Sequence, residues 1–164
     1  MQKTLVLLKP DAVQRGLAGE IISRFEKAGL KLVGAKMLQP DEAHYHHHYE
    51  GISQLKSRIG EEPFNQNTEF MMSGPVIAMV LEGDDAVVKV RQLVGATDPG
   101  QAEKGTIRGD YGEMTLADAK QLNIALANIV HASGNTEEAK AEVEHWFKPE
   151  ELFDYKAAHQ PLTQ

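Results

Sequence analysis

The chain has 164 residues, of which 41% are hydrophobic, and this predicts one domain, residues 1–164, with a substantial hydrophobic core. A formal net charge of −7 argues against nucleic-acid binding, which needs a basic face to neutralise phosphates. The chain has no cysteine, which excludes disulfides and cysteine-ligated metals. No apolar run approaches the roughly 20 residues of a membrane span, and the first residues lack a signal-peptide pattern. We therefore expect a cytoplasmic protein with no membrane or nucleic-acid partner.

Hydrophobic periodicity predicts a strand, a helix and a second strand at the start of the chain. Residues 4–9 are nearly all apolar, which is typical of a strand buried on both faces. Residues 17–28 place apolar side chains on one helical face, and Gly29 follows as a C-terminal stop. The alternation over residues 30–38 predicts the second strand, and a polar helix is expected over residues 40–49.

The middle of the chain combines a buried strand and a helix with a long glycine-rich segment. Residues 76–81 form a third apolar run, and residues 86–94 carry apolar side chains at helical spacing. Residues 95–113 hold five glycines and one proline, so we expect a loop. Long loops in a compact domain are commonly functional, and this segment is therefore a candidate binding loop.

Residues 115–127 predict an additional helix, because Thr115 is a good N-cap with an aspartate three residues later. The apolar stripe of this helix consists of Leu116, Ala119, Leu122 and Leu126. A fourth strand is expected over residues 128–133. A final helix follows, with Thr136 as its cap and acidic residues in its first turn. Residues 148–164 are expected to form a tail.

The predicted order of elements is strand, helix, strand, helical segment, strand, helix, strand, helix. This order suits an α+β fold of the ferredoxin-like type, a βαββαβ antiparallel sheet with helices on one face. The segments outside this core are expected to be extra helical insertions.

Candidate phosphate ligands come from side chains, because the sequence lacks both the P-loop pattern GxxxxGK[ST] and GxGxxG. Lys9 is the last residue of an apolar strand and directly precedes a proline. Arg108 lies in a glycine-flanked loop, where the backbone can approach a ligand and a guanidinium can fork onto phosphate oxygens. Arg91 and Thr97 are further candidates. Three of these residues also have an explanation that involves no ligand. Lys9 would be a solubilising charge at a strand end, Arg91 an exposed helix residue and Thr97 a turn residue.

His131 is the candidate nucleophile. It ends an apolar run and is followed by small residues that leave room for a ligand. The structural alternative is a buried histidine whose ring nitrogens are hydrogen-bonded to neighbouring residues.

A second group of histidines suggests a metal site. On a helix, His44 and His48 would share one face at i,i+4, a spacing that can bind zinc. No carboxylate or third histidine is clearly placed beside them. We therefore favour the alternative, a solvated helix face.

Three segments of the sequence resemble the nucleoside diphosphate kinase family. These are KPDAVQRGLAGEII at 9–22, GTIRGD at 105–110 and the NxxH motif at 128–131. The first two are specific, and the resemblance extends over nearly the whole chain. It implies the ferredoxin-like fold and an enzyme that transfers the γ-phosphate of a nucleoside triphosphate, ATP, to a nucleoside diphosphate. The transfer would be ping-pong and would pass through a phosphohistidine.

The resemblance also implies a role for each candidate residue. His131 corresponds to the nucleophile, phosphorylated at its pros nitrogen. Ser133 and Glu142 correspond to a hydrogen-bonding pair in which the glutamate orients the imidazole. The remaining counterparts are Lys9 and Tyr49 at the transferred phosphate, Arg91, Thr97 and Arg108 at the β- and γ-phosphates, Asn128 at the ribose and Phe64 as the aromatic that stacks on the base.

The implied cofactor is Mg²⁺, held through the nucleotide phosphates without a direct protein ligand. The implied partners are nucleoside di- and triphosphates. The family forms hexamers or tetramers, so a homo-oligomer is expected.

The chain departs from the family pattern in two respects. The usual HGSD is here His131-Ala132-Ser133-Gly134, so one glycine and the aspartate are missing. Insertions lie around residues 51–60 and 114–127, and the apolar stripe of the second predicts packing against the nucleotide site or a subunit contact. These departures leave an alternative function open, that of a catalytically weak nucleotide-binding or scaffolding relative.

Overall fold

The computed structural model describes residues 1–158 and contains a four-stranded sheet in the order β2-β3-β1-β4. The strands are β1 (Gln2–Leu8), β2 (Lys31–Leu38), β3 (Val76–Gly83) and β4 (Val130–Ala132). The helices that cross between them are α2 (Ala18–Lys27) and α6 (Ala86–Val94). Every neighbouring pair of strands is antiparallel, so the predicted βαββαβ ferredoxin-like fold is confirmed.

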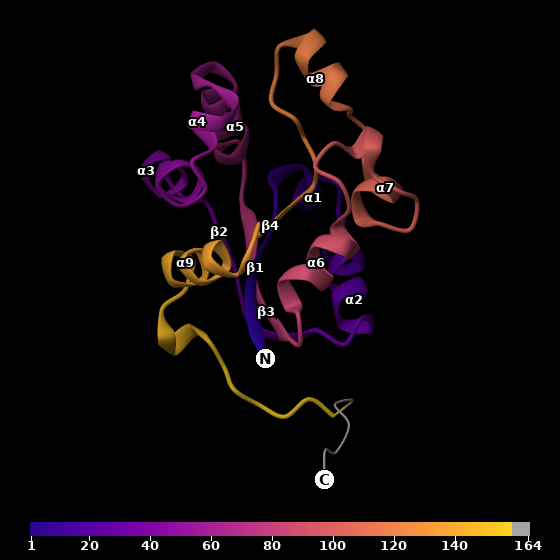
Figure 1. Cartoon of the computed structure of the whole chain (residues 1–164), viewed down its shortest axis with the longest axis vertical. Helices are drawn as coiled ribbons and strands as arrows, with labels where there is room; N and C mark the ends of the chain where they lie inside the picture. Colours follow the sequence, from indigo (N-terminus) through magenta and orange to yellow (C-terminus); the bar gives the residue numbers. More distant parts are fainter. Residues whose placement is uncertain (159–164) are drawn as a thin grey trace.

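Helices cover both faces of the sheet (Figure 1). α2 and α6 pack on the face that carries Val6 and Leu8 of β1. Leu5 and Leu7 point to the opposite face, where a second set of helices packs. This set consists of α3 (Glu42–His46), α5 (Glu61–Met72) and α9 (Thr136–Trp146). The expectation of helices on one face is therefore too narrow, because a strand that is apolar on both sides needs cover on both.

The sequence pattern does not predict helices α1 and α5. Helix α1 (Pro10–Gln14) is a single short turn that begins at a proline, where the missing N–H costs no hydrogen bond. Helix α5 follows the short helix α4 (Leu55–Ile59) and is mostly polar. Its buried side chains are Phe64, Thr68 and Met71. Such a narrow stripe is a weak amphipathic signal.

The glycine-rich segment 95–113 is partly helical and not a continuous loop. It contains the 3₁₀ turn η2 (Pro99–Gln101) and helix α7 (Ile107–Tyr111). The hydroxyl of Thr106 caps α7 by accepting a hydrogen bond from a backbone amide of its first turn. Arg108 therefore lies in a helix, which corrects its expected place in a loop.

The inserted helix α8 (Leu116–Leu122) begins as predicted. Thr115 and Asp118 form a reciprocal capping box at its start. The helix ends well before Ala127, because Asn123 adopts the left-handed conformation with a φ of 52°.

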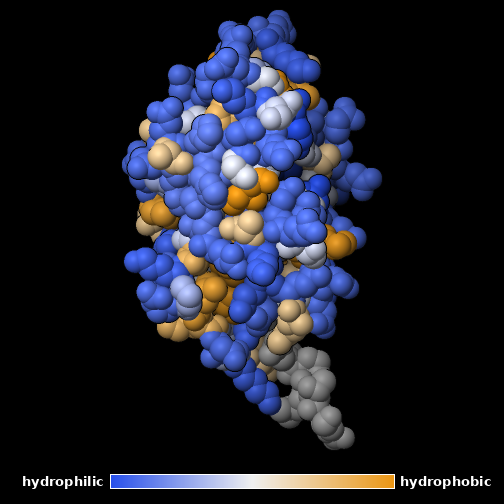
Figure 2. Space-filling view, turned by 60° about the vertical axis from the view of Figure 1, so that its left-hand side comes forward, coloured by the Kyte–Doolittle hydropathy of each residue, from blue (hydrophilic) through white to orange (hydrophobic). Residues whose placement is uncertain are grey.

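The apolar stripe of α8 is largely exposed. Leu122 is 63% and Leu116 is 40% accessible, whereas Ala119 is buried. The face of the molecule shown in Figure 2 is mainly hydrophilic with scattered apolar patches. Within residues 1–158, no helix is long and apolar enough to span a membrane. Only Ala119 of the stripe is buried within one chain, so the two leucines of α8 remain available for a contact outside it.

The C-terminal elements differ in detail from the prediction. The cap of α9 is Asn135 and not Thr136, because its side chain is the one that accepts the helical amide bond. The 3₁₀ turn η3 (Pro149–Glu151) follows. Beyond it the chain is held along β2, where the amide of Phe153 donates to Val33 and other side chains add bonds. The expected tail is thus pinned up to residue 158, and its remainder lies outside the described residues.

Candidate active site

β4 carries His131 at the edge of the sheet, opposite Leu7 of β1. The strand is preceded by a γ-turn, in which the amide of Val130 donates to the carbonyl of Asn128 over 2.8 Å. The central residue of this turn, Ile129, has a φ of 75°, which is strained for a β-branched side chain. Such strain persists only where the surroundings fix the backbone, and it is common at functional sites.

Two side chains fix this turn. The carboxylate of Asp11 accepts from the amide of Ile129 over 3.1 Å. The guanidinium of Arg108 donates to three backbone carbonyls, those of Gly95 (3.3 Å), Asn128 (3.1 Å) and Val130. Arg108 is buried, and burial, together with the charge of Arg91, lowers the pKa of its guanidinium to about 10. Arg108 therefore braces the backbone next to the nucleophile, and only its two other N–H groups are left for a phosphate.

Lys9 and Asn128 form a buried pair beside this turn. The Nζ of Lys9 donates to the Oδ1 of Asn128 over 2.6 Å, and the Nδ2 of Asn128 donates to the carbonyl of Thr97 over 2.9 Å. Burial lowers the pKa of Lys9 to about 7, and the charge of Arg108 acts in the same direction. The structure thus brings together Lys9, Thr97 and Asn128, which are not neighbours in the sequence. With a pKa of about 7, Lys9 is partly charged and partly neutral near neutral pH.

The ring of His131 is oriented by a chain of hydrogen bonds. Its Nε2 lies 3.1 Å from both carboxylate oxygens of Glu142. The hydroxyl of Ser133 donates to the same carboxylate over 2.5 Å and accepts from the amide of Leu5 over 3.2 Å. Ser133 and Glu142 are fully buried, whereas the His131 side chain is 14% exposed. A carboxylate at Nε2 fixes a proton there and leaves Nδ1 with a lone pair, which is the form that a nucleophilic histidine needs.

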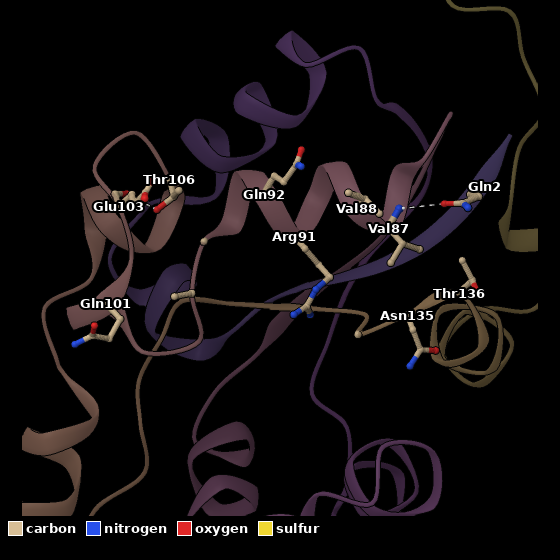
Figure 3. A pocket seen from close by; sticks show the side chains of 13 residues that line it. Gln2, Val87, Val88, Arg91, Gln92, Gln101, Glu103, Thr106, Asn135 and Thr136 are labelled. Carbon is tan, nitrogen blue, oxygen red and sulfur yellow. Dashed lines mark hydrogen bonds between the residues drawn. The ribbon is translucent and has the colours of Figure 1, made fainter.

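Arg91 and Thr97 lie at the surface beside this centre. Arg91 extends from α6 into an open pocket of about 790 Å³ (Figure 3). Asn135 and Thr136, at the start of α9, border the same pocket. The charge of Arg91 lowers the pKa of Arg108, so the two guanidiniums act on one region. An exposed cation above buried ones is a suitable arrangement for a ligand with several negative charges.

Two aromatic residues differ in their relation to the site. Tyr49 is 5% exposed, its ring centroid lies 6.0 Å from that of His131, and its hydroxyl has no hydrogen-bond partner in the part of the chain that the structure describes. Phe64 is 4% exposed and packs against the edge of His46 in the core. The expected role of Phe64 as the aromatic that stacks on the base stays a prediction.

His48 is not on a solvated helix face. It lies in the π-helical segment η1 (His47–Ile52), is fully buried, and its ring centroid is 4.5 Å from that of His131. Our preferred expectation for this residue is therefore wrong, and the reason is that α3 and η1 pack against α9 rather than against solvent. His48 and Asp11 are the residues of the site that sequence reasoning missed. Their only signals are their positions next to Tyr49 and next to the Lys9-Pro10 pair.

The comparisons with known proteins agree with this geometry. The family model described as nucleoside diphosphate kinase matches residues 2–152. The chain belongs to the nucleoside diphosphate kinase family. A nucleoside diphosphate kinase of Pyrococcus furiosus is 47% identical over 159 residues, which cover 96% of this chain and 91% of the relative. One of Brugia malayi is 45% identical over 157 residues, covering 96% and 92%.

Solved structures of nucleoside diphosphate kinases share the fold. The enzyme of Borrelia burgdorferi, described as a transition-state mimic with bound vanadate and ADP, has a TM-score of 0.92 at 41% identity and covers 96% of this chain and 93% of its own. The enzyme of Halobacterium salinarum, in complex with CDP, has a TM-score of 0.81 at 41% identity and covers 96% and 94%. The chain is therefore an enzyme that transfers phosphate between nucleotides. The alternative of a catalytically weak relative is not favoured.

Proposed function

We propose that this kinase transfers the γ-phosphate of ATP to nucleoside diphosphates through a phosphohistidine at Nδ1 of His131. The observation that carries the proposal is the pair of 3.1 Å contacts between Nε2 of His131 and the carboxylate of Glu142. In the first half-reaction Nδ1 attacks the γ-phosphorus, a nitrogen–phosphorus bond forms, and the bond to the β-phosphate oxygen breaks. In the second, a β-phosphate oxygen of the acceptor diphosphate attacks the same phosphorus and Nδ1 leaves. The Nε2 proton stays on the ring throughout, held by Glu142.

The cationic side chains are proposed to stabilise the phosphate chain during this transfer. Phosphoryl transfer depends mostly on positioning and on charge stabilisation. We assign Lys9 and Tyr49 to the transferred phosphate, because both have polar groups buried beside His131. The other assignments are Arg91, Thr97 and Arg108 at the β- and γ-phosphates and Asn128 at the ribose.

The donor set of the site fits Mg²⁺ carried on the nucleotide rather than held by the protein. Mg²⁺ prefers oxygen ligands and commonly binds through substrate phosphates and water. Here the carboxylate of Glu142 is bonded to His131 and Ser133, and one oxygen of Asp11 accepts the amide of Ile129. The charged side chains assigned to the phosphates, Lys9, Arg91 and Arg108, are cations and cannot bind a metal ion. When bound to the phosphates, Mg²⁺ would offset part of their negative charge. A cytoplasmic location and a homo-oligomer, either hexamer or tetramer, complete the proposal.

The proposal is tested by labelling the protein in the absence of an acceptor. Incubation with γ-labelled ATP should leave one phosphoryl group that is stable in base and labile in acid, and a second diphosphate such as GDP should remove it. His131→Ala should abolish the label, whereas His47→Ala, at an exposed histidine, should keep it. A label that persists in His131→Ala would show that another residue is the acceptor.

A further inference from the structure

His48 packs directly against the ring of His131. The two ring centroids are 4.5 Å apart with an interplanar angle of 76°, an edge-to-face arrangement. His48 is fully buried and accepts a hydrogen bond from Trp146 of α9. Nothing in the proposed phosphate transfer so far uses this residue, although it is the aromatic ring with the shortest centroid distance to His131 among residues 1–158.

The position of the proton on His48 follows from its partner. The indole Nε1 of Trp146 donates to Nδ1 of His48 over 3.1 Å, and an indole can only donate. Burial lowers the pKa of His48, and the charges of His131, His145 and His44 act in the same direction, so the ring is neutral. Its single proton is therefore on Nε2.

This N–H group has no hydrogen-bond partner among the described residues. One nitrogen of His48, one nitrogen of His131 and one carboxylate oxygen of Glu142 lie within 4.8 Å of one another. Two histidines and a carboxylate are a ligand set that zinc accepts. A metal needs an unprotonated nitrogen, however, and Trp146 already occupies the one that His48 offers, so this arrangement does not favour a metal.

A buried donor close to a buried carboxylate has a different use. Glu142 is fully buried, and a buried carboxylate needs hydrogen-bond donors around it. Ser133 and His131 supply two hydrogen bonds. The ring of His48 lies in the same small space, and its Nε2–H group has no other partner among the described residues.

We propose that His48 is a positioning residue for phosphoryl transfer, which holds the His131 ring edge to face and turns its Nε2–H dipole toward the Glu142 carboxylate, so that the proton stays on Nε2 of His131 and Nδ1 keeps its lone pair. This inference rests on the proposed role of His131. It adds a residue that acts through Glu142 and His131 and does not touch the nucleotide.

The test uses two substitutions that separate the two nitrogens of His48. His48→Gln can keep an amide donor near the position of Nε2. His48→Asn can keep an acceptor for Trp146 near Nδ1 but does not reach Glu142. His47→Gln, at the exposed neighbour, is the matched control. For each full-length protein we would measure the single-turnover rate of phosphorylation by ATP and the KM for ATP.

The expected result is a split between the two variants. His48→Asn should lose about tenfold or more in phosphorylation rate, with the KM for ATP within about twofold. His48→Gln should stay within about threefold of the wild type. Equal rates in both variants, whether normal or reduced, would overturn the proposal.

A measurement on the wild-type protein keeps the proposal testable even if a variant does not fold. The ¹⁵N shifts of the imidazole nitrogens should show His48 neutral with its proton on Nε2, and His131 with a proton on Nε2 and a bare Nδ1. A proton on Nδ1 of His48, or a charged His48 ring at pH 7, would overturn the inference. These shifts need no phosphorylation, so they separate a failure of His48 from a failure of His131 to become labelled.

Discussion

The Nζ of Lys9 and the Oδ1 of Asn128 are 2.6 Å apart, and both side chains are buried. The bond joins the end of β1 to the turn that precedes His131. It leaves the lysine with one neutral amide acceptor, while Arg108 places a positive charge nearby. An ammonium in this position is stabilised much better by phosphate than by the protein alone.

Nucleotide binding should therefore take up a proton. The pKa of Lys9 is about 7 without a ligand, so at pH 8 most of the lysine is neutral. A phosphate beside it should raise that pKa and recharge the amine. Titration calorimetry of ADP binding at pH 8, in two buffers of different ionisation enthalpy, measures the uptake. Lys9→Met should remove it, whereas Lys89→Met, at an exposed lysine of α6, should not; equal uptake in all three proteins would contradict the assignment.

Replacing Arg108 by alanine should reduce both turnover and stability. The substitution removes hydrogen bonds to three backbone carbonyls, and each buried group left without a partner costs roughly 1–3 kcal/mol. The loss of transition-state stabilisation should be about 2–4 kcal/mol, the scale for one electrostatic donor. Steady-state kinetics and thermal unfolding check the two effects.

Arg91 provides the matched contrast for Arg108. It is exposed on α6, so Arg91→Ala should lower turnover while the melting temperature stays within about 1 °C, as is usual for surface substitutions. If both arginine variants melt like the wild type, the bracing role of Arg108 is wrong.

The histidines between α3 and α9 should make the fold acid-sensitive. Burial lowers the pKa of His44 to about 4, and the pKa values of His48 and His145 are also lowered. The unfolded chain, with histidine pKa values of about 6.5, binds more protons than the folded chain between pH 6.5 and 4. The free energy of unfolding should therefore fall as the pH falls through this range. Urea unfolding at pH 7, 6 and 5 should show a smaller fall in His44→Gln than in the wild type or in His46→Gln.

The exposed stripe of α8 should affect assembly rather than the stability of the single chain. Leu122 is 63% exposed, so Leu122→Ser removes no packing that is visible within one chain. If copies of this kinase associate through α8, the variant should form a smaller particle in size-exclusion chromatography with light scattering. Ala119→Ser, at a buried position of the same helix, should lower the melting temperature instead. An unchanged particle mass for Leu122→Ser would show that α8 lies outside the subunit contacts.

The sheet and its crossover helices could be predicted from the sequence because burial there is strong and regular. A strand covered on both faces is apolar where it is buried, and α6 turns most of its apolar side chains to one face. The hydrophobic pattern does not predict α5, which is mostly polar, or α7, which contains a glycine. In those segments tertiary contacts and a cap at Thr106 decide the structure, and periodicity does not report them.

The site shows the same division. His131, Lys9 and Arg108 could be proposed as candidates because each stands out chemically from its own segment. The resemblance adds Asn128, Ser133 and Glu142 to these candidates. Their contacts could not be predicted, because the bond between Lys9 and Asn128 joins residues 119 positions apart and because His48 is buried in a segment whose sequence is mostly polar. The bracing of three carbonyls by Arg108 has no sequence signal at all.

The pairing of His131 with Leu7 has a consequence for how the molecule moves. β4 can leave the sheet only by breaking its pairing with Val6, Leu7 and Leu8 of β1, which are fully buried, so its opening should be costly. The α8 segment has exposed side chains and a left-handed end, so it should open locally at little cost. The backbone that carries the nucleophile should therefore exchange its amide protons more slowly than the α8 segment does.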